Sequence, residues 1–408
     1  MTDRTLHTIL ESEQAMGESV MARSRRMILF YITHIENVPS ILERGILCHE
    51  IVEREGIQYT PVYDPRIVAR RRERKAPDGR DLWSFANLYF QPRNPMLYKV
   101  LLEQSPENIV ILAVRADILN PKDVFISTGN AASLQSEILV RDDGVKAITR
   151  MADVLDLEWW SREVGSSRKI MAECLVPDRV PPEYIQAIYV ASHEAAAKAR
   201  EATEQWGIQI IPEPHMFFRP SRVVQVTPNM SLVQGDMFFS RMHTLTVSVN
   251  CVGVMGKGLA SSAKYRFPDV YVFYQDLCRK KILRIGKPYL YKRESSSDDL
   301  LADEPATLTN GNPETWFLLF PTKHHWREQS SLPGIEQGLQ WLQSKYKEEG
   351  VKSLAIPALG CGLGRLQWRD VGPLICRYLA SLDIPVWLYL PAEQQVPEEM
   401  VSKEFLLG

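Results

Sequence analysis

The chain has 408 residues, which is too long for one ordinary domain, so we expect two domains. Hydrophobic residues make up 45% of the sequence and charged residues 24%, which is the composition of a soluble globular protein. The formal net charge of -2 does not by itself indicate a class of partner. Its distribution is more informative, because basic clusters lie in the first half, at residues 23–26 and 66–75, and acidic runs lie later.

The six cysteines are scattered, with no Cys-x-x-Cys pair and no Cys/His cluster at zinc spacing. This pattern favours a reducing cytoplasm and predicts no structural metal. No secretory signal is visible, and the apolar run Met27–Ile32 is far too short to span a membrane. We therefore expect a cytoplasmic protein without a membrane partner.

In chain order, residues 1–26 are polar and are predicted to be a leader outside the folded part. Met27–His34 then reads as a buried strand that ends in the polar pair Thr33 and His34. Asn37–Leu47 reads as a short helix with a glycine stop. Strand ends are where α/β sheets hold ligands, so His34 is a ligand-facing candidate, with a structural histidine as the alternative.

Pro65–Lys75 is strongly basic, which predicts either a solvated helix face or a surface for the phosphates of NAD or a nucleic acid. Leu88–Tyr98 mixes aromatic residues with Arg, Asn and Pro in no regular period. We expect it to be a loop that contacts a ligand, and a core strand with an edge proline is the alternative.

Further strands are predicted at Asn108–Val114 and from Phe125, and Lys169–Pro177 places one carboxylate, Glu173, inside an apolar run. Such a group is costly to bury unless it is paired or faces a cleft, where it could stabilise positive charge or accept a proton. The alternative is an outward-facing Glu on a half-exposed strand. A helix is expected at Ala195–Gln205, followed by a proline-punctuated linker at residues 206–222.

The first half resembles the DarT family of DNA-base ADP-ribosyltransferase toxins over roughly Ile28–Ser192. The resemblance implies an α+β ADP-ribosyltransferase-type domain over residues 27–205, with NAD as its substrate. The motifs that carry it are Tyr31–His34 with Pro39–Leu42, the Arg70/Arg71 pair, Tyr89–Tyr98, Gly129–Ala132 and Ala172–Pro177.

The same resemblance implies the roles of individual residues. Glu173 would be the catalytic glutamate, and one arginine of the pair Arg70 and Arg71 would contact NAD and be needed for transfer. The NAD pocket would be lined by Thr33, His34, Tyr89 and Met96.

The second half contains two glycine loops, each after an apolar strand. Leu245–Val249 leads into Gly253–Gly258 and a helix from Leu259, and Ser353–Pro357 leads into Gly360–Gly364. A strand, a glycine loop and a helix present backbone N–H groups to phosphate, although a plain tight turn gives the same pattern. Two such loops on neighbouring strands could clamp a diphosphate.

Asp236 follows a Gly at a strand end, where it could accept from an adenine amino group or act as a turn aspartate. Arg293–Pro313 is polar and predicts a mobile loop. Trp316–Phe320 predicts a buried strand that leads to Lys323, and a lysine there is ordinarily a surface charge.

The second half resembles a macrodomain, and more narrowly the DarG antitoxin branch, from about Val223 to Pro391. The resemblance implies a three-layer α/β/α macrodomain over residues 223–408 in which Lys323 is catalytic. Arg365 stands where this family usually has Gly, and its bulk is expected to narrow the distal ribose pocket. ADP-ribose would be bound by Asp236, Asn250, Gly253, Val254, Met255, Gly256, Gly360, Cys361, Gly362, Leu363 and Gly364.

Together the two resemblances predict a toxin and its antitoxin fused in one chain. The first domain would transfer ADP-ribose from NAD to a base in single-stranded DNA, with thymine favoured and guanine second. The second would hydrolyse it from the ADP-ribosylated DNA without a metal, and the two domains could also touch. The alternatives are a macrodomain that only binds ADP-ribose, and a transferase that acts on RNA or protein.

Overall fold

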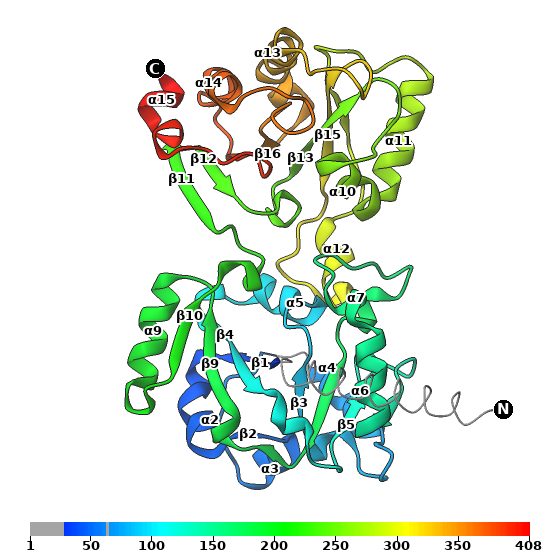
Figure 1. The fold of residues 1–408 in the computed structure, drawn as a ribbon, viewed down its shortest axis with the longest axis vertical. Helices are drawn as coiled ribbons and strands as arrows, with labels where there is room; N and C mark the ends of the chain where they lie inside the picture. The colour runs from blue at the N-terminus through cyan, green and yellow to red at the C-terminus, as the bar shows by residue number, and fades with distance from the viewer. Residues whose placement is uncertain (1–27, 63–64) are drawn as a thin grey trace, which may run out of the picture. The chain divides into compact units, whose positions relative to one another are not determined.

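The computed structural model describes residues 28–62 and 65–408, so the predicted leader at residues 1–26 lies outside the described residues. The chain forms two compact units (Figure 1). The first unit contains residues up to Phe217 together with Leu301–Thr309, and the second contains Phe218–Leu300 and Asn310–Gly408. The short segment Leu301–Thr309 is therefore separated in sequence from the unit in which it packs.

The first unit is built on one mixed sheet with the strand order β10-β9-β4-β1-β3-β7-β5-β6. Its neighbouring strands run antiparallel, except that β10 and β9 are parallel. A separate antiparallel pair joins β2 and β8. The strands are β1 (Ile28–His34), β2 (Ile46–Leu47), β3 (Phe85–Tyr89), β4 (Ile109–Arg115), β5 (Phe125–Ser127), β6 (Ile138–Val140), β7 (Glu173–Pro177), β8 (Arg179–Val180), β9 (Ile185–Val190) and β10 (Gln209–Pro212).

Helices connect these strands, and their ends follow local sequence signals. Gly45 ends one helix with a φ of 91°, and a Cβ there would lie 2.3 Å from the Val180 carbonyl oxygen. Asn94 caps another by accepting from the Leu97 N–H at 3.0 Å, with Pro95 at its first position. The helices of this unit are α2 (Val38–Arg44), α3 (His49–Arg54), α4 (Pro65–Glu73), α5 (Pro95–Glu103), α6 (Arg141–Arg150), α7 (Ala152–Leu155), α8 (Ser166–Lys169) and α9 (His193–Thr203).

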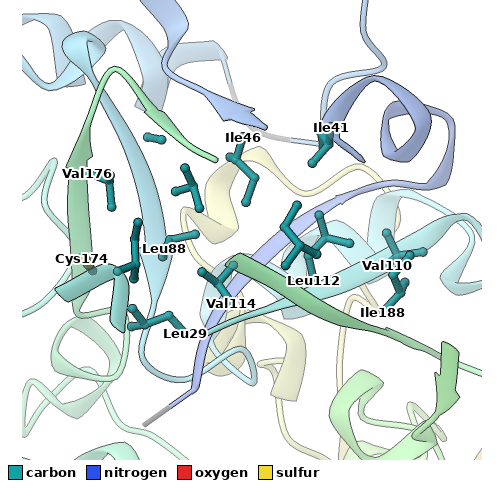
Figure 2. Packing of buried hydrophobic residues seen from close by; sticks show 14 of the residues in the cluster. Leu29, Ile41, Ile46, Leu88, Val110, Leu112, Val114, Cys174, Val176 and Ile188 are labelled. Atoms are coloured by element: carbon teal, nitrogen blue, oxygen red, sulfur yellow. The ribbon is translucent and has the colours of Figure 1, made fainter. Parts of the chain in front are cut away.

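The core of the first unit is aliphatic and lies against this sheet (Figure 2). Ile109 through Val114 on β4 are fully buried, because β4 lies inside the sheet and is covered on both faces. Leu29, Leu88 and Ile188 from neighbouring strands pack in the same cluster (Figure 2). This packing fixes the strand ends on which the polar site residues stand.

The second unit is a sheet with the strand order β11-β12-β17-β16-β13-β15-β14. Its inner strands, from β12 to β15, are parallel, as expected when helices connect them. The strands are β11 (Arg222–Thr227), β12 (Met230–Gln234), β13 (Thr244–Asn250), β14 (Tyr289–Tyr291), β15 (Trp316–Lys323), β16 (Leu354–Pro357) and β17 (Val386–Tyr389).

Helices cover both faces of this sheet, which gives the three layers of the predicted macrodomain fold (Figure 1). Alternate residues of β15 show this, because Phe320 packs with α13 and α14, while Phe317 meets Phe267 at 4.7 Å between ring centroids. The helices are α10 (Gly258–Arg266), α11 (Pro268–Arg279), α12 (Ser297–Leu301), α13 (Leu332–Glu349), α14 (Trp368–Leu379) and α15 (Lys403–Leu407).

Two expectations from the sequence are wrong. Residues 209–212 form β10 and pair with β9, so that part of the expected linker is a strand of the first sheet. Arg293–Pro313 is not simply a mobile loop, because it contains α12 and the buried residues Ser296 and Asp298. Asp298 accepts from the Asn312 N–H at 2.8 Å, which closes the segment on itself.

Candidate active sites

Glu173 is the first residue of β7 and is 1% exposed. One carboxylate oxygen accepts from Arg71 Nη1 at 2.8 Å, and the other accepts from the Ala131 N–H at 2.8 Å. Its own N–H donates to Ser127 Oγ at 3.0 Å. The side chain is thus buried and paired, and the alternative of an outward-facing glutamate is wrong.

Arg71 has a guanidinium group that is only partly used by the protein. Its Nη1 holds Glu173, while its Nη2 is buried without a hydrogen-bond partner. A buried donor without a partner is unfavourable, so this nitrogen is suited to an oxygen of a bound substrate. Burial, and next the Arg71 guanidinium, lower the pKa of His49 to about 4.

A cavity of about 490 Å³ opens beside this ion pair, within the usual range for small-molecule sites. Of the predicted NAD-binding residues, Thr33, Tyr89 and Met96 line it together with Arg71 and Glu173. Tyr89 is opposite Glu173 in the β3–β7 register, and burial, with Glu173 adding, raises the pKa of its hydroxyl. These predicted residues therefore meet at one cavity.

Two predicted residues are placed elsewhere. His34 is not among the residues that line the cavity, and its Nδ1 accepts from the Glu36 N–H at 3.3 Å as a helix cap. Arg70 does not line the cavity either, and it pairs with Glu304 at 2.7 Å. The structure thus supports the structural role for His34, and it brings Arg71 rather than Arg70 to Glu173.

Sequence reasoning missed several residues of the cavity wall. Asn37 donates to Thr33 Oγ1 at 3.1 Å and to the Thr60 carbonyl at 2.8 Å, which joins the end of β1 to the loop that contains Thr60. His49 and Asn130 also line it. Asn130 could have been predicted, since it belongs to the glycine-containing turn after β5. The sequence around His49 has no pattern that indicates a ligand-binding role.

In the second unit, the predicted residues meet at the carboxyl ends of parallel strands. Asn250 ends β13 and is the register partner of Lys323 at the end of β15, and the Gly360–Gly364 loop follows β16. Ligands in open α/β sheets bind at this edge. An ideal Cβ on Gly258 would lie 3.6 Å from Leu363 Cδ1, so the two glycine loops are neighbours.

The first glycine loop is folded by Asn250. The amide oxygen accepts from the Val252 N–H at 3.0 Å, and the amide nitrogen donates to the Val254 carbonyl at 2.6 Å. Gly253 takes a φ of 80°, where a side chain would be strained. Asn250 therefore shapes the loop rather than presenting its own amide. Of the other predicted residues here, Val254 is exposed, Met255 is buried and Gly256 is exposed.

The second glycine loop is tightly packed against neighbouring segments. A Cβ on Gly364 would lie 2.3 Å from Ser330 Oγ, and one on Gly362 would lie 3.0 Å from the Glu393 carboxylate. Gly360 has a φ of 77°. Leu363 is 58% exposed and Cys361 is buried, so the loop presents its backbone and Leu363 outward.

Lys323 ends β15, opposite Asn250 at the end of β13, and is 9% exposed. Its Nζ donates to the Glu328 carbonyl at 2.9 Å and to the Leu363 carbonyl at 3.0 Å. Burial, and next the nearby Arg365 charge, lower the pKa of this amine. Lys323 is therefore not an ordinary surface lysine, and its neutral form is more populated than usual.

Both carboxylate oxygens of Asp236 accept hydrogen bonds from the protein. One oxygen accepts from the Phe238 N–H at 2.9 Å, and the other pairs with Arg266 Nη1 at 2.6 Å. The structure thus shows the turn-aspartate role, with a second function as the partner of a half-buried arginine.

Over residues 28–62 and 65–408, no group of His, Cys, Asp and Glu is arranged to hold a metal ion. In the same residues, no helix combines the length and apolar character needed to cross a membrane. All six cysteines are free thiols.

Comparison with known proteins agrees with this geometry. Residues 30–218 match the family described as "ssDNA thymidine ADP-ribosyltransferase, DarT", and residues 307–375 match the macro domain family. A "DNA ADP-ribosyl transferase-DNA ADP-ribosyl glycohydrolase fusion protein" of Thermosipho africanus is 57% identical over 93% of this chain and 98% of its own length. A DNA ADP-ribosyl glycohydrolase of Thermus aquaticus is 34% identical over 42% of this chain and 44% of its own length.

Among solved structures, Thermosipho africanus DarTG in complex with ADP-ribose superposes with a TM-score of 0.89 at 56% identity, covering 93% of this chain and all of that chain. The similarity extends through both units and keeps their order. The chain therefore belongs to the DarTG family and joins a DNA ADP-ribosyl transferase and a DNA ADP-ribosyl glycohydrolase in one polypeptide, as the Thermosipho relative does.

Proposed function

We propose that the first unit transfers ADP-ribose from NAD to a thymine in single-stranded DNA and that the second unit removes it. The observation that carries the proposal is the buried Arg71–Glu173 pair at the wall of a cavity large enough for a small-molecule ligand. The description of the family matched by residues 30–218 names thymidine, which favours thymine over guanine. The ADP-ribose complex of the Thermosipho relative supports the same ligand here.

The transfer step needs two actions at the nicotinamide ribose. The bond between the anomeric carbon and nicotinamide breaks, and the bonding electrons leave with nicotinamide. The thymine ring nitrogen that is not bonded to deoxyribose forms the new bond to the anomeric carbon. The thymine N–H proton is released. We assign Glu173 to the ribose hydroxyl and the developing positive charge, because its carboxylate is fixed from both sides.

Arg71 is assigned to binding of the substrate through its spare Nη2 donor. Thr33, Tyr89 and Met96 are assigned to the NAD pocket because they line the same cavity. Arg70 and His34 are not assigned to this pocket, because Arg70 pairs with Glu304 and His34 caps the helix that follows β1.

The removal step is assigned to the sheet edge of the second unit. The N–H groups of the two glycine loops are suited to the diphosphate, and Lys323 donates to the Leu363 carbonyl of the second loop. Its lowered pKa favours the neutral amine as a nucleophile at the anomeric carbon, with the base leaving and taking up a proton. Water then releases ADP-ribose and restores the amine.

We place the working protein in the cytoplasm, where NAD is available and the six free thiols stay reduced. Functionally, the transferase corresponds to residues up to Phe217 and the hydrolase to residues from Phe218. Segment Leu301–Thr309 belongs in sequence to the second of these parts and in space to the first.

The test uses the Lys323→Ala chain, so that the product is not erased. It is incubated with labelled NAD and matched pools of single-stranded DNA, RNA and protein. We expect label on DNA alone. Label found only on RNA or protein would show that the transferase assignment is wrong. If the parent and the Lys323→Ala chain removed label from DNA equally fast, the assignment of Lys323 would be wrong.

A further inference from the structure

The segment Leu301–Thr309, called the strap below, lies between α12 and β15 in sequence but packs in the first unit. In Figure 1 it is the yellow chain that follows α12 and lies beside α5. The strap begins with a backbone attachment. The Trp160 Nε1–H donates to the Leu301 carbonyl at 2.9 Å, and the Asp303 N–H donates to the Pro95 carbonyl at 3.0 Å. These bonds join the strap to α5 and to the segment before α8.

The strap then covers cationic side chains. Glu304 accepts from Arg70 Nη2 at 2.7 Å, and Arg162 donates to the Ala302 carbonyl. Lys99 donates to Thr307 Oγ1. Arg70, Arg162 and Lys99 come from three separate segments, and the strap is the element on which their side chains converge. We call these three side chains the cationic face.

The strap also borders the catalytic cavity. Asp303 and Thr307 line the cavity that contains Arg71 and Glu173. Lys99 lines it as well, so the cationic face is continuous with the site of transfer. A polyanion that delivers a base to this cavity must pass this rim, and its phosphates would be drawn to the same cations.

The strap is not bound in an optimal way. One carboxylate oxygen of Asp303 is buried without a hydrogen-bond partner, which is unfavourable. Burial, and next the neighbouring Glu304, raise the pKa of Asp303, while Lys99, Arg162 and Arg70 act in the opposite direction. The Arg70–Glu304 pair is half exposed, with side-chain exposures of 51% and 39%, and such pairs contribute little. These features are expected of an element that a stronger anionic ligand can displace.

We propose that the cationic face made by Arg70, Lys99 and Arg162 binds the phosphates of single-stranded DNA at the transferase cavity, and that the strap occupies this face in competition with the DNA. This inference rests on the proposed function, since it assumes a DNA substrate. It assigns Arg70 a place on the DNA path instead of a place in the NAD pocket. It also assigns the strap residues Asp303 and Glu304 the role of opposing DNA entry.

The test measures binding of a fluorescent thymine-containing single-stranded oligonucleotide to the full chain by anisotropy, without NAD. The strap variant is Asp303→Asn/Glu304→Gln, which keeps the side-chain shapes and removes two negative charges. The control is Glu194→Gln/Glu201→Gln on α9, which changes the net charge equally at exposed positions away from the cavity lining. We expect the strap variant to bind about threefold to tenfold more tightly than the control pair.

A second comparison tests the cationic face. Arg70→Gln is introduced into the parent and into the strap variant, and we expect a larger loss of oligonucleotide affinity in the strap variant, where Arg70 is no longer paired with Glu304. Equal losses in both backgrounds, or a strap variant that binds no more tightly than the control pair, would overturn the proposal. A lower KM for NAD with unchanged oligonucleotide affinity would overturn it too, because the strap would then oppose NAD.

These outcomes are separable from failure of the proposed function. Binding is read without NAD and without turnover, so a chain that binds single-stranded DNA but fails to transfer ADP-ribose would still report on the strap. In the Lys323→Ala background, Glu304→Gln alone, which lies outside the cavity lining, is expected to lower the KM for the oligonucleotide and to leave kcat nearly unchanged. A change in kcat alone would contradict competition for the DNA path.

Discussion

At the residue scale, the two adjacent arginines Arg70 and Arg71 have different positions relative to the site of the first unit. The resemblance to DarT implies a role for Arg70 or Arg71 but does not choose between them. Consecutive helical positions point about 100° apart, and their direction is set by how α4 packs. The structure sends Arg71 to the buried Glu173 and Arg70 to Glu304. Glu173 itself was predictable, since a carboxylate in an apolar strand needs a partner.

Glu173→Gln is expected to lower the rate of transfer by about a hundredfold to ten-thousandfold, because the neutral amide cannot stabilise developing positive charge. The measurement is the rate of nicotinamide release in the presence of the oligonucleotide. The matched control is Arg72→Gln on α4, whose guanidinium stacks over Trp83 at 4.8 Å and not in the cavity. Near-parent transfer by Glu173→Gln would remove this residue from the mechanism.

Lys323 gives the hydrolase a predicted pH dependence. Because its pKa is lowered, the neutral amine appears at lower pH than for an ordinary lysine, and a nucleophilic amine is active only when neutral. The rate of ADP-ribose release from DNA should therefore rise with pH and level off once pH exceeds this lowered pKa. A rate that falls across the same range would identify Lys323 as a proton donor.

Arg365 has a φ of 62°, a left-handed conformation that favours glycine. The Arg365 position is therefore strained as well as charged. Arg365→Gly is expected to raise the free energy of unfolding by about 0.5–1 kcal/mol, measured by urea denaturation. Loss of the charge also raises the pKa of Lys323, so the rising limb of the hydrolase pH profile should move to higher pH. An unchanged limb would show that Arg365 does not act on Lys323.

At the element scale, strands and glycine loops followed closely from sequence, while pairing partners did not. β13 was expected at Leu245–Val249 and spans Thr244–Asn250, because its apolar, β-branched run suits a buried parallel strand. β10 was expected to be linker, since Pro212 marks it as irregular. As an edge strand it needs a partner on one side only, and β9 supplies it. Only the assembled sheet shows this.

The packing of α13 on β15 depends on a missing side chain. A Cβ on Gly338 would lie 2.4 Å from Phe320 Cζ, and Phe320 is fully buried. In Gly338→Ala, the clash with Phe320 should lower the free energy of unfolding of the second unit by about 1–3 kcal/mol. The higher helix propensity of Ala should offset about 1 kcal/mol of this loss. Urea unfolding measures this, with Ser344→Ala on the exposed part of the same helix as control. Equal stability of the two variants would show that Phe320 can move aside.

At the scale of the whole molecule, two separate resemblances predicted two functional parts, and the relative with both activities in one chain confirms that order. What the sequence could not show is that the chain returns to the first unit at Leu301–Thr309. The stretch around it is polar and reads as a loop, and its bonds to Trp160 and Pro95 depend on residues more than 100 positions away. The first unit is therefore completed by a segment that follows the start of the second unit in sequence.

The central claim is that Glu173 writes a DNA mark that Lys323 on the same chain erases. Mass spectrometry of one thymine-containing oligonucleotide tests it directly, first after NAD and the Lys323→Ala chain, and then after NAD is removed and the Glu173→Gln chain is added. We predict a mass gain of one ADP-ribose on thymine in the first step and its complete loss in the second. A mark that forms on another base, or one that persists after the second step, would contradict the claim.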